Sequence, residues 1–290
     1  MSAIDYVDVA WNVVTGCSND GCPCRADCWA MRMARRMAEN SSVQYRERYE
    51  GFKPAFWPER LDQPQSWKKP RVVFVASMGD WCDLGIKDSE RRLIFEAMRK
   101  APQHVYLFLT KRGEWQGEFV RENFQLFRGL RVWFGISVWD QKSYLAAVLA
   151  LVTTYAAGRW ISLEPILGPV SPANAETEGP ERIDWLVAGG GSGRNAVPVH
   201  PYWPGMLHSY CADRKIPFYW KQWGEWGGYS AWQNAGCPRV ENHIVVHTSL
   251  CDGSGVEMHR LGKKLSGCRI NGQEIREVPD WWSDKMIFGD

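Results

Sequence analysis

The sequence lacks the features that mark several classes of protein. No stretch of about 18 apolar residues is present, so no segment is expected to span a membrane. The first residues, MSAIDYVDVAW, contain no basic segment followed by an apolar run, so we expect no secretory signal. The formal net charge is only +2, so nucleic acid would have to be held by a local basic patch. Together these absences predict a cytoplasmic protein.

The sequence also lacks the second cysteine pair that most zinc sites have. Nine cysteines are present, and four of them lie within twelve residues: Cys17, Cys22, Cys24 and Cys28. Further along the chain, isolated cysteines are interpreted as buried or incidental thiols: Cys211, Cys237, Cys251 and Cys268. In a long chain without a signal peptide, a compact cysteine group is typical of a metal site. The group predicts an iron–sulfur cluster, with a structural zinc site as the alternative.

The cysteine group lies between the first predicted strand and the first predicted helix. Cys28 stands at the start of that helix, where free backbone amides and the helix dipole favour a thiolate. A four-iron cluster held by three thiolates has one iron without a protein ligand. S-adenosylmethionine can bind at such an iron, and its cleavage to a 5′-deoxyadenosyl radical starts radical chemistry. The pattern therefore indicates a radical enzyme.

Short apolar runs rich in β-branched and aromatic residues recur at about the length of one strand–helix unit. The predicted strands are Val7–Trp11, Val72–Ala76, Val105–Leu109, Val132–Ile136, Trp160–Leu163, Trp185–Ala188 and Phe218–Trp220. The predicted helices are Ala26–Glu39, Ser89–Lys100, Glu114–Phe127, Asp140–Leu151 and Trp203–Arg214. The strands are continuously apolar, as in parallel sheets covered on both faces. This pattern predicts an α/β fold with a complete or partial parallel (β/α) barrel, and a doubly wound sheet is the alternative.

The strand–helix spacing is lost after about residue 226. Glycine and tryptophan become frequent there, and Gly262–Ile275 is expected to form a hairpin that turns at Asn271-Gly272. We therefore predict a barrel over residues 1–226 and, over residues 227–290, a C-terminal extension packed on it.

Polar residues follow most of the predicted strands. The carboxyl ends of barrel strands face the active site, so these residues are the candidates for chemistry. The segment Ser77-Met78-Gly79-Asp80 follows the second strand, and Ser137 follows the fourth. Charged side chains follow three other strands: Lys111, Glu164 and Lys221. For the segment 77–80 the alternative is a strand-end turn, and for each charge it is a solvated or ion-paired surface position.

The segment Gly189–Gly193 lacks the spacing, the helix and the acidic residue of a dinucleotide-binding site, which excludes that class. It could let a ligand approach backbone amides, or it is a plain loop.

Several motifs together resemble a phage and bacterial family of three-cysteine radical S-adenosylmethionine proteins. They are Thr15-Gly16-Cys17 with the cysteines that follow, Phe74–Asp80, Leu109–Arg112, Ser162–Pro165, Gly168-Pro169-Val170, His200-Pro201 and Lys221–Trp226. The resemblance runs from Asp8 to about Trp226. Family members have a wide first cysteine gap, then CxxC and Tyr-Ala. This chain keeps six residues between Cys17 and Cys24 but has three between Cys24 and Cys28, and Cys22 is extra.

This resemblance implies a [4Fe-4S] cluster on Cys17, Cys24 and Cys28, with S-adenosylmethionine as the second cofactor. It implies that the segment 77–80 receives the methionyl amine and that Ser137 lies near the ribose. The best-defined activity of the family is an isomerase step in phage DNA hypermodification, in which a thymine bearing N-linked glycine becomes Cα-linked. The implied partners are modified thymine in DNA or as a nucleotide, and an electron donor of the flavodoxin or ferredoxin type. A phage-encoded enzyme would work in the host cytoplasm.

Two alternatives to this function stay open. One is another radical enzyme acting on nucleic acid, such as a lesion lyase, which releases a repaired base where an isomerase conserves mass. The other is a non-catalytic, metal-stabilised module that binds nucleic acid and shows salt-sensitive binding without turnover.

Overall fold

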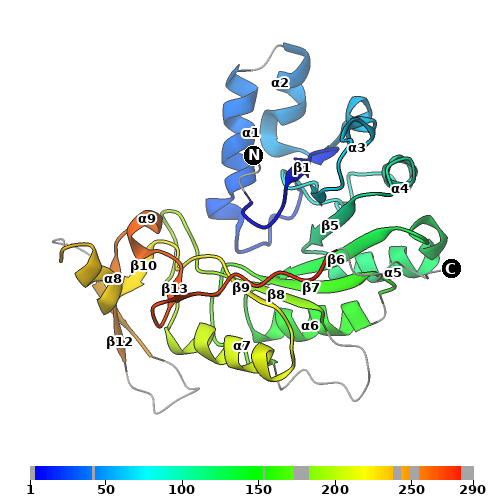
Figure 1. The fold of residues 1–290 in the computed structure, drawn as a ribbon. Helices are drawn as coiled ribbons and strands as arrows, with labels where there is room; N and C mark the ends of the chain where they lie inside the picture. Colours follow the sequence, from blue (N-terminus) through cyan, green and yellow to red (C-terminus); the bar gives the residue numbers. More distant parts are fainter. Residues whose placement is uncertain are drawn as a thin grey trace. The chain divides into compact units, whose positions relative to one another are not determined.

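A computed structural model describes residues 4–40, 43–152, 154–172, 183–237, 243–247 and 255–281 (Figure 1). The chain divides into two compact units. The first comprises residues 1–136, 150–159 and 280–290, and the second comprises residues 137–149 and 160–279. Cys251 lies outside the described residues.

The first unit contains the parallel strands that the apolar runs predict. They are β1 (Val9–Trp11), β4 (Val72–Val75), β5 (Val105–Thr110) and most of β6 (Arg131–Val138). β1 pairs with β4, β4 with β5 and β5 with β6, all in parallel. A short antiparallel pair, β2 (Val14–Thr15) with β3 (Ala55–Phe56), supports the segment that leads to Cys17.

Helices follow these strands along the chain. In the first unit they are α1 (Trp29–Asn40), α2 (Val43–Tyr49), α3 (Gln63–Ser66), α4 (Asp88–Arg99) and α5 (Gly113–Glu122). Single turns of 3₁₀ helix lie at Arg25–Asp27, Glu50–Phe52, Pro58–Arg60 and Phe124–Leu126. The prediction of one helix over Glu114–Phe127 is corrected, because α5 ends at Glu122 and a separate turn follows.

The second unit contains the strands β7 (Gly158–Leu163, from Trp160 on), β8 (Trp185–Ala188) and β9 (Phe218–Trp220), which pair in parallel in that order. Its helices include most of α6 (Gln141–Val152), and α7 (Tyr202–Asp213). After β9 the pairing becomes antiparallel, in a sheet of β10 (Trp226–Gly228), β12 (Val256–Arg260) and β11 (His243–Val246). The remaining elements are α8 (Tyr229–Asn234), α9 (Lys263–Ser266) and the pair β13 (Arg269–Ile270) and β14 (Gln273–Glu274).

The parallel strands are almost completely buried, as the continuously apolar runs predict. Every residue of β4, β8 and β9 is buried, and tryptophans fill much of the core. Trp81, for example, is fully buried and packs on Phe95, Phe108 and Phe134. Such rings contribute burial of about 150–250 Å² each.

The α/β class is confirmed. The seven parallel strands follow one another in chain order, whereas a doubly wound sheet would reverse that order at one point. The arrangement fits a partial parallel barrel. Among the described residues, no helix is long and apolar enough to cross a membrane.

Candidate functional site

The loop that carries Cys17 is fixed from both sides by backbone contacts. Gly16 has φ +81°, and a Cβ there would lie 2.0 Å from the carbonyl oxygen of Lys53. The Gly16 amide donates to Met78, and the Asp80 amide donates to the Gly16 carbonyl over 3.2 Å. A Cβ on Gly79 would lie 2.8 Å from the same Gly16 carbonyl. Two glycines are therefore required where the cysteine loop meets the loop after β4.

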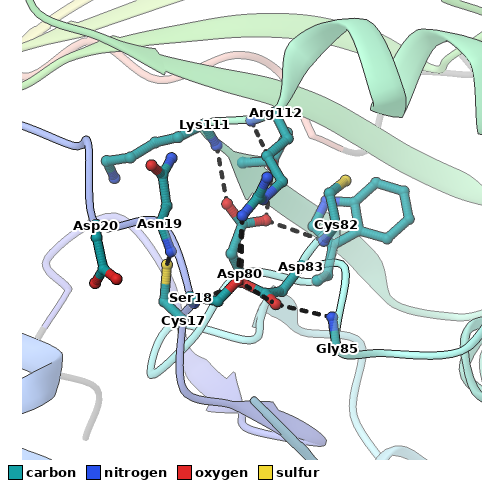
Figure 2. A network of polar contacts seen from close by, with 12 residues as sticks. Cys17, Ser18, Asn19, Asp20, Asp80, Cys82, Asp83, Gly85, Lys111 and Arg112 are labelled. Atoms are coloured by element: carbon teal, nitrogen blue, oxygen red, sulfur yellow. Dashed lines mark hydrogen bonds and ion pairs between the residues drawn. The ribbon is translucent and has the colours of Figure 1, made fainter. Parts of the chain in front are cut away.

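Asp83 ties the cysteine loop to this scaffold. It is fully buried, and Oδ2 accepts the Ser18 amide at 2.7 Å while the Ser18 hydroxyl lies 3.0 Å from both oxygens (Figure 2). Oδ1 also accepts the Gly85 amide, and the Arg112 guanidinium lies 3.7 Å from Oδ2. The position of Cys17 therefore depends on a carboxylate 66 residues further along the sequence.

Asp80 is a second buried anchor in this network. Oδ1 accepts the Thr110 hydroxyl at 2.6 Å and the Cys82 amide at 2.9 Å, and Oδ2 accepts the Lys111 amide at 3.1 Å (Figure 2). A carboxylate offers about four acceptor positions, so protein donors already fill most of those on Asp80. Asp80, which was predicted to receive the methionyl amine, therefore serves mainly to connect the loop after β4 with the loop after β5.

Three of the cysteine thiols form a chain of hydrogen bonds. The Sγ atoms of Cys22 and Cys24 lie 2.6 Å apart, and the Cys24 thiol also has a hydrogen bond with Cys28. Cys28 immediately precedes α1, which begins three residues later than the predicted helix, and its sulfur accepts the Met31 amide at 3.5 Å. Cys22, the extra residue of the motif, is therefore part of the group.

The pKa values of these thiols depend on their neighbours. Burial, with the carboxylates of Asp80 and Asp83, raises the pKa of Cys17 to about 11. The hydrogen bond that Cys24 donates lowers the pKa of Cys22 to about 7, in spite of burial. The pKa of Cys28 is raised, because its thiol forms a hydrogen bond with Cys24 and is buried. Hydrogen bonds from the backbone amides of Met31 and Ala30 lower the pKa, but they offset the rise only in part. The amides at the helix start therefore favour the Cys28 thiolate, as expected, but the hydrogen bond with Cys24 and burial outweigh them.

Lys111 faces this group. Burial alone would lower its pKa, but the charges of Cys24, Cys22 and Asp80 together raise it. Its side chain extends from the end of β5 toward the loop that carries Asn19 and Asp20 (Figure 2). Lys111 therefore supplies a positive charge beside the thiols. Such a charge would help a site at these cysteines to hold an anionic ligand.

Soft thiolates are the ligands that iron–sulfur clusters prefer, so the cysteine thiols of this group are chemically suitable ligands for such a cluster. The arrangement is not that of an assembled centre. Among the residues that the structure describes, no group of three or more His, Cys, Asp or Glu side chains is placed to hold a metal ion. Two thiolates on one zinc, at Zn–S distances of about 2.3 Å, would be about 3.7 Å apart. Cys22 and Cys24, 2.6 Å apart, would have to separate before both could bind the same zinc ion.

The other predicted cofactor residues have distinct surroundings. Asn12, at the end of β1, accepts the Ser77 hydroxyl at 3.0 Å and the Met78 amide at 2.9 Å, which fixes the start of the segment 77–80. Ser137 is buried within β6, which continues to Val138, so the expected strand end at residue 136 is corrected.

The second unit brings Glu164 and Lys221 together. The Lys221 ammonium lies 3.2 Å from Oε2 of Glu164, which also accepts the Ser162 hydroxyl at 3.1 Å. These residues lie at the carboxyl ends of β7 and β9, as strand-end chemistry predicts. A Cβ on Gly189, which follows β8, would lie 2.9 Å from Oε1 of Glu164, so the carboxylate occupies the space that a side chain would fill.

The glycine segment Gly189–Gly193 is held in place by the loop after β9 and by Arg260 of the extension. The Gly193 amide donates to Glu225, and the Arg260 guanidinium donates to the carbonyl of Gly193 at 2.9 Å. Gln222 accepts the Gly190 amide through its backbone carbonyl at 2.8 Å. The backbone of the segment Gly189–Gly193 is therefore fixed by contacts with other parts of the protein, and this favours a structural role for the segment.

Sequence reasoning missed Asp83 and Asn12. The spacing Asp80-Trp81-Cys82-Asp83 was available as a signal, because two carboxylates just past a buried strand often form one network. Asn12 follows a predicted strand but offers no motif.

Comparison with known proteins completes the description of this site. The chain matches no curated protein and no solved structure. One family profile matches residues 1–279, which is nearly the whole chain. The chain therefore belongs to the family described as "Protein of unknown function (DUF5131)".

Proposed function

We propose that this protein is a radical S-adenosylmethionine enzyme that holds a [4Fe-4S] cluster on Cys17, Cys24 and Cys28. The observation that carries the proposal is the gathering of cysteine thiols beside the Lys111 ammonium, on a loop anchored by two buried carboxylates. The cluster and S-adenosylmethionine would supply a 5′-deoxyadenosyl radical that removes a hydrogen atom from the substrate.

The residues of the first unit would bind and orient in this function. Asp83 holds the Cys17 loop through Ser18, so one ligand keeps its place when the other thiols rearrange. Lys111 would bind the carboxylate of S-adenosylmethionine or of the substrate. The segment from Ser77 to Asp80 would present the remaining Asp80 acceptor position to an ammonium.

The substrate class comes from the family resemblance, which indicates isomerisation of a glycine-modified thymine from N-linked to Cα-linked. Glu164 and Lys221 suit such a substrate, because one charge of the pair can meet a glycyl ammonium and the other its carboxylate. Their 3.2 Å contact would open as the substrate enters. Within this proposal Glu164 is also the group that can move a proton.

The test is anaerobic reconstitution with iron and sulfide, followed by dithionite and S-adenosylmethionine, with 5′-deoxyadenosine as the product measured. Wild type is expected to form it, and Cys17→Ala, Cys24→Ala and Cys28→Ala are each expected to lose at least 100-fold. Cys22→Ala is the matched control and is expected to retain activity. Equal losses in all four variants, or no product from wild type, would overturn the three-ligand proposal.

A second candidate function is a non-catalytic module stabilised by zinc. It is favoured by the position of Cys22, which lies with Cys24 and gives the group a fourth thiol. In that case Cys22→Ala would release zinc like the other three variants, and metal removal would unfold the first unit without any turnover to lose. Metal content by atomic emission and stability after chelation separate the two functions.

A further inference from the structure

A cavity of about 940 Å³ lies in the second unit, between α7 and the β13–β14 pair. Two motifs that stand out in the sequence border it: His200-Pro201 before α7, and the turn that contains Asn271. Ligand pockets of small molecules commonly have volumes of about 300–1,000 Å³, so a nucleoside fits.

The lining of this cavity carries flat rings and amides but no formal charge. Its residues include Tyr202, Met206, His208, Asn271, Gln273 and Ile275, and among the lining residues there is no Lys, Arg, Asp or Glu. Tyr202 is exposed to 43%, although it is a large side chain on the first turn of a helix. Ile275 is buried and adds an apolar side chain to the lining.

The chemistry of the lining narrows the class of ligand. Without a lysine or an arginine, the cavity has no permanent cation to neutralise a phosphate or a carboxylate, so a charged group inside it would lose its hydration without full compensation. Side-chain amides pair with edges that carry both a donor and an acceptor, and aromatic faces stack on flat rings. An uncharged, planar heterocycle whose edge carries both a hydrogen-bond donor and an acceptor can pair with the amides and stack on the aromatic rings.

We infer that this cavity binds a nucleobase, stacked on Tyr202 and read at its edge by Asn271 and Gln273. The inference rests on the proposed function, because the proposed substrate is a modified thymine in nucleic acid or in a nucleoside. The base contacts lie in the second unit alone and involve none of the cysteines.

The experiment measures binding of thymidine and adenosine to the full chain by saturation-transfer NMR, without iron or S-adenosylmethionine. Wild type is expected to bind, and Tyr202→Ala is expected to bind at least about fivefold more weakly, because one base stack is worth about 1–3 kcal/mol. Gln273→Ala is expected to weaken binding while keeping the stack. The matched control is Tyr229→Ala, another exposed tyrosine outside the cavity, which is expected to bind as wild type does.

Thymidine 5′-monophosphate is expected to bind within twofold of thymidine, with no change between low and high salt. Binding that requires the phosphate, or that is equal in wild type, Tyr202→Ala and Gln273→Ala, would overturn the inference. So would the absence of any nucleoside binding. Because no cluster is present in the assay, such a failure is distinct from a failure to form 5′-deoxyadenosine, which would overturn the radical enzyme itself.

Discussion

The cysteine loop of the first unit and the Glu164–Lys221 pair of the second unit present charged groups after parallel strands in two different ways. Asp83 and Asp80 are 0% and 5% exposed, and each accepts at least three hydrogen bonds from protein donors. The side chains of Glu164 and Lys221 are 17% and 31% exposed and meet in one ion pair with one further hydroxyl. The first arrangement fixes a loop, and the second leaves charges that a ligand can reach.

This difference has a consequence for mutation. A buried carboxylate that satisfies several donors cannot be removed without leaving those donors unpaired, so stability and site geometry fail together. A partly exposed ion pair contributes about 0–1 kcal/mol, so it can change without loss of the fold.

The largest effect is expected from Gly16→Ala. The new Cβ would lie 2.0 Å from the Lys53 carbonyl oxygen, in a backbone conformation with φ +81°. We expect about 3 kcal/mol of lost unfolding free energy, or failure to fold, measured by chemical denaturation. The matched control is Gly129→Ala, which has φ +76° and nothing within 4 Å, so only the backbone cost of about 1 kcal/mol remains. Equal losses in the two variants would show that the contact with Lys53 does not constrain the loop.

Asp83→Ala is expected to have the next largest effect. It removes the acceptor of the Ser18 and Gly85 amides, whose hydrogen bonds are partly buried, and a hydrogen bond to a charged group contributes about 1.5–3 kcal/mol. Urea denaturation should show a loss of about 2–4 kcal/mol, together with reduced iron uptake on reconstitution. Asp62→Ala, an exposed aspartate of the same unit that bonds Gln65, should lose less than about 1 kcal/mol. The anchor role of Asp83 is wrong if the two variants are equally stable.

Asp80→Asn tests the link between the loops after β4 and β5. The amide nitrogen would face a donor, either the Lys111 amide or the pair from Thr110 and Cys82, so we expect a loss of about 1–3 kcal/mol. Thr110→Val removes one donor and should cost about 1 kcal/mol, while Thr110→Ser keeps the hydroxyl and should retain stability. If Asp80→Asn is as stable as wild type, Asp80 is free to serve a ligand instead.

The smallest effect on stability, less than about 1 kcal/mol, is expected from Lys221→Met, because the ion pair is partly exposed and screened by salt. Lys264→Met, at an exposed position in α9, is the control. The two variants should have similar melting temperatures, and only Lys221→Met should reduce turnover of a glycine-bearing substrate. A loss of stability as large as that of Asp83→Ala would remove the contrast between the two regions.

Much of the fold could be predicted from the sequence. The runs from Val72 to Trp220 match the observed parallel strands within two residues, because a strand buried on both faces must be apolar throughout. The turn at Asn271-Gly272 was also predicted, and it has the positive φ values of such a turn, 49° and 82°. The helix α2 and the antiparallel sheet of β10, β12 and β11 were missed. β11 is only four residues long and mostly exposed, and its run of apolar residues shows no alternation that would mark it as a half-buried strand.

For the candidate site, the sequence by itself determined which chemistry is available: four clustered cysteines at a helix start, and charged residues after parallel strands. Spacing along the chain is sufficient for this, because a strand end and the loop after it are local features. Only the tertiary structure decided that Asp83 anchors the Cys17 loop and that Cys22 lies against Cys24. It also decided that Lys221 meets Glu164. These contacts join residues from separate elements or depend on side-chain packing, and hydrogen bonds and burial of this kind form only when the strands and loops that carry them have been assembled.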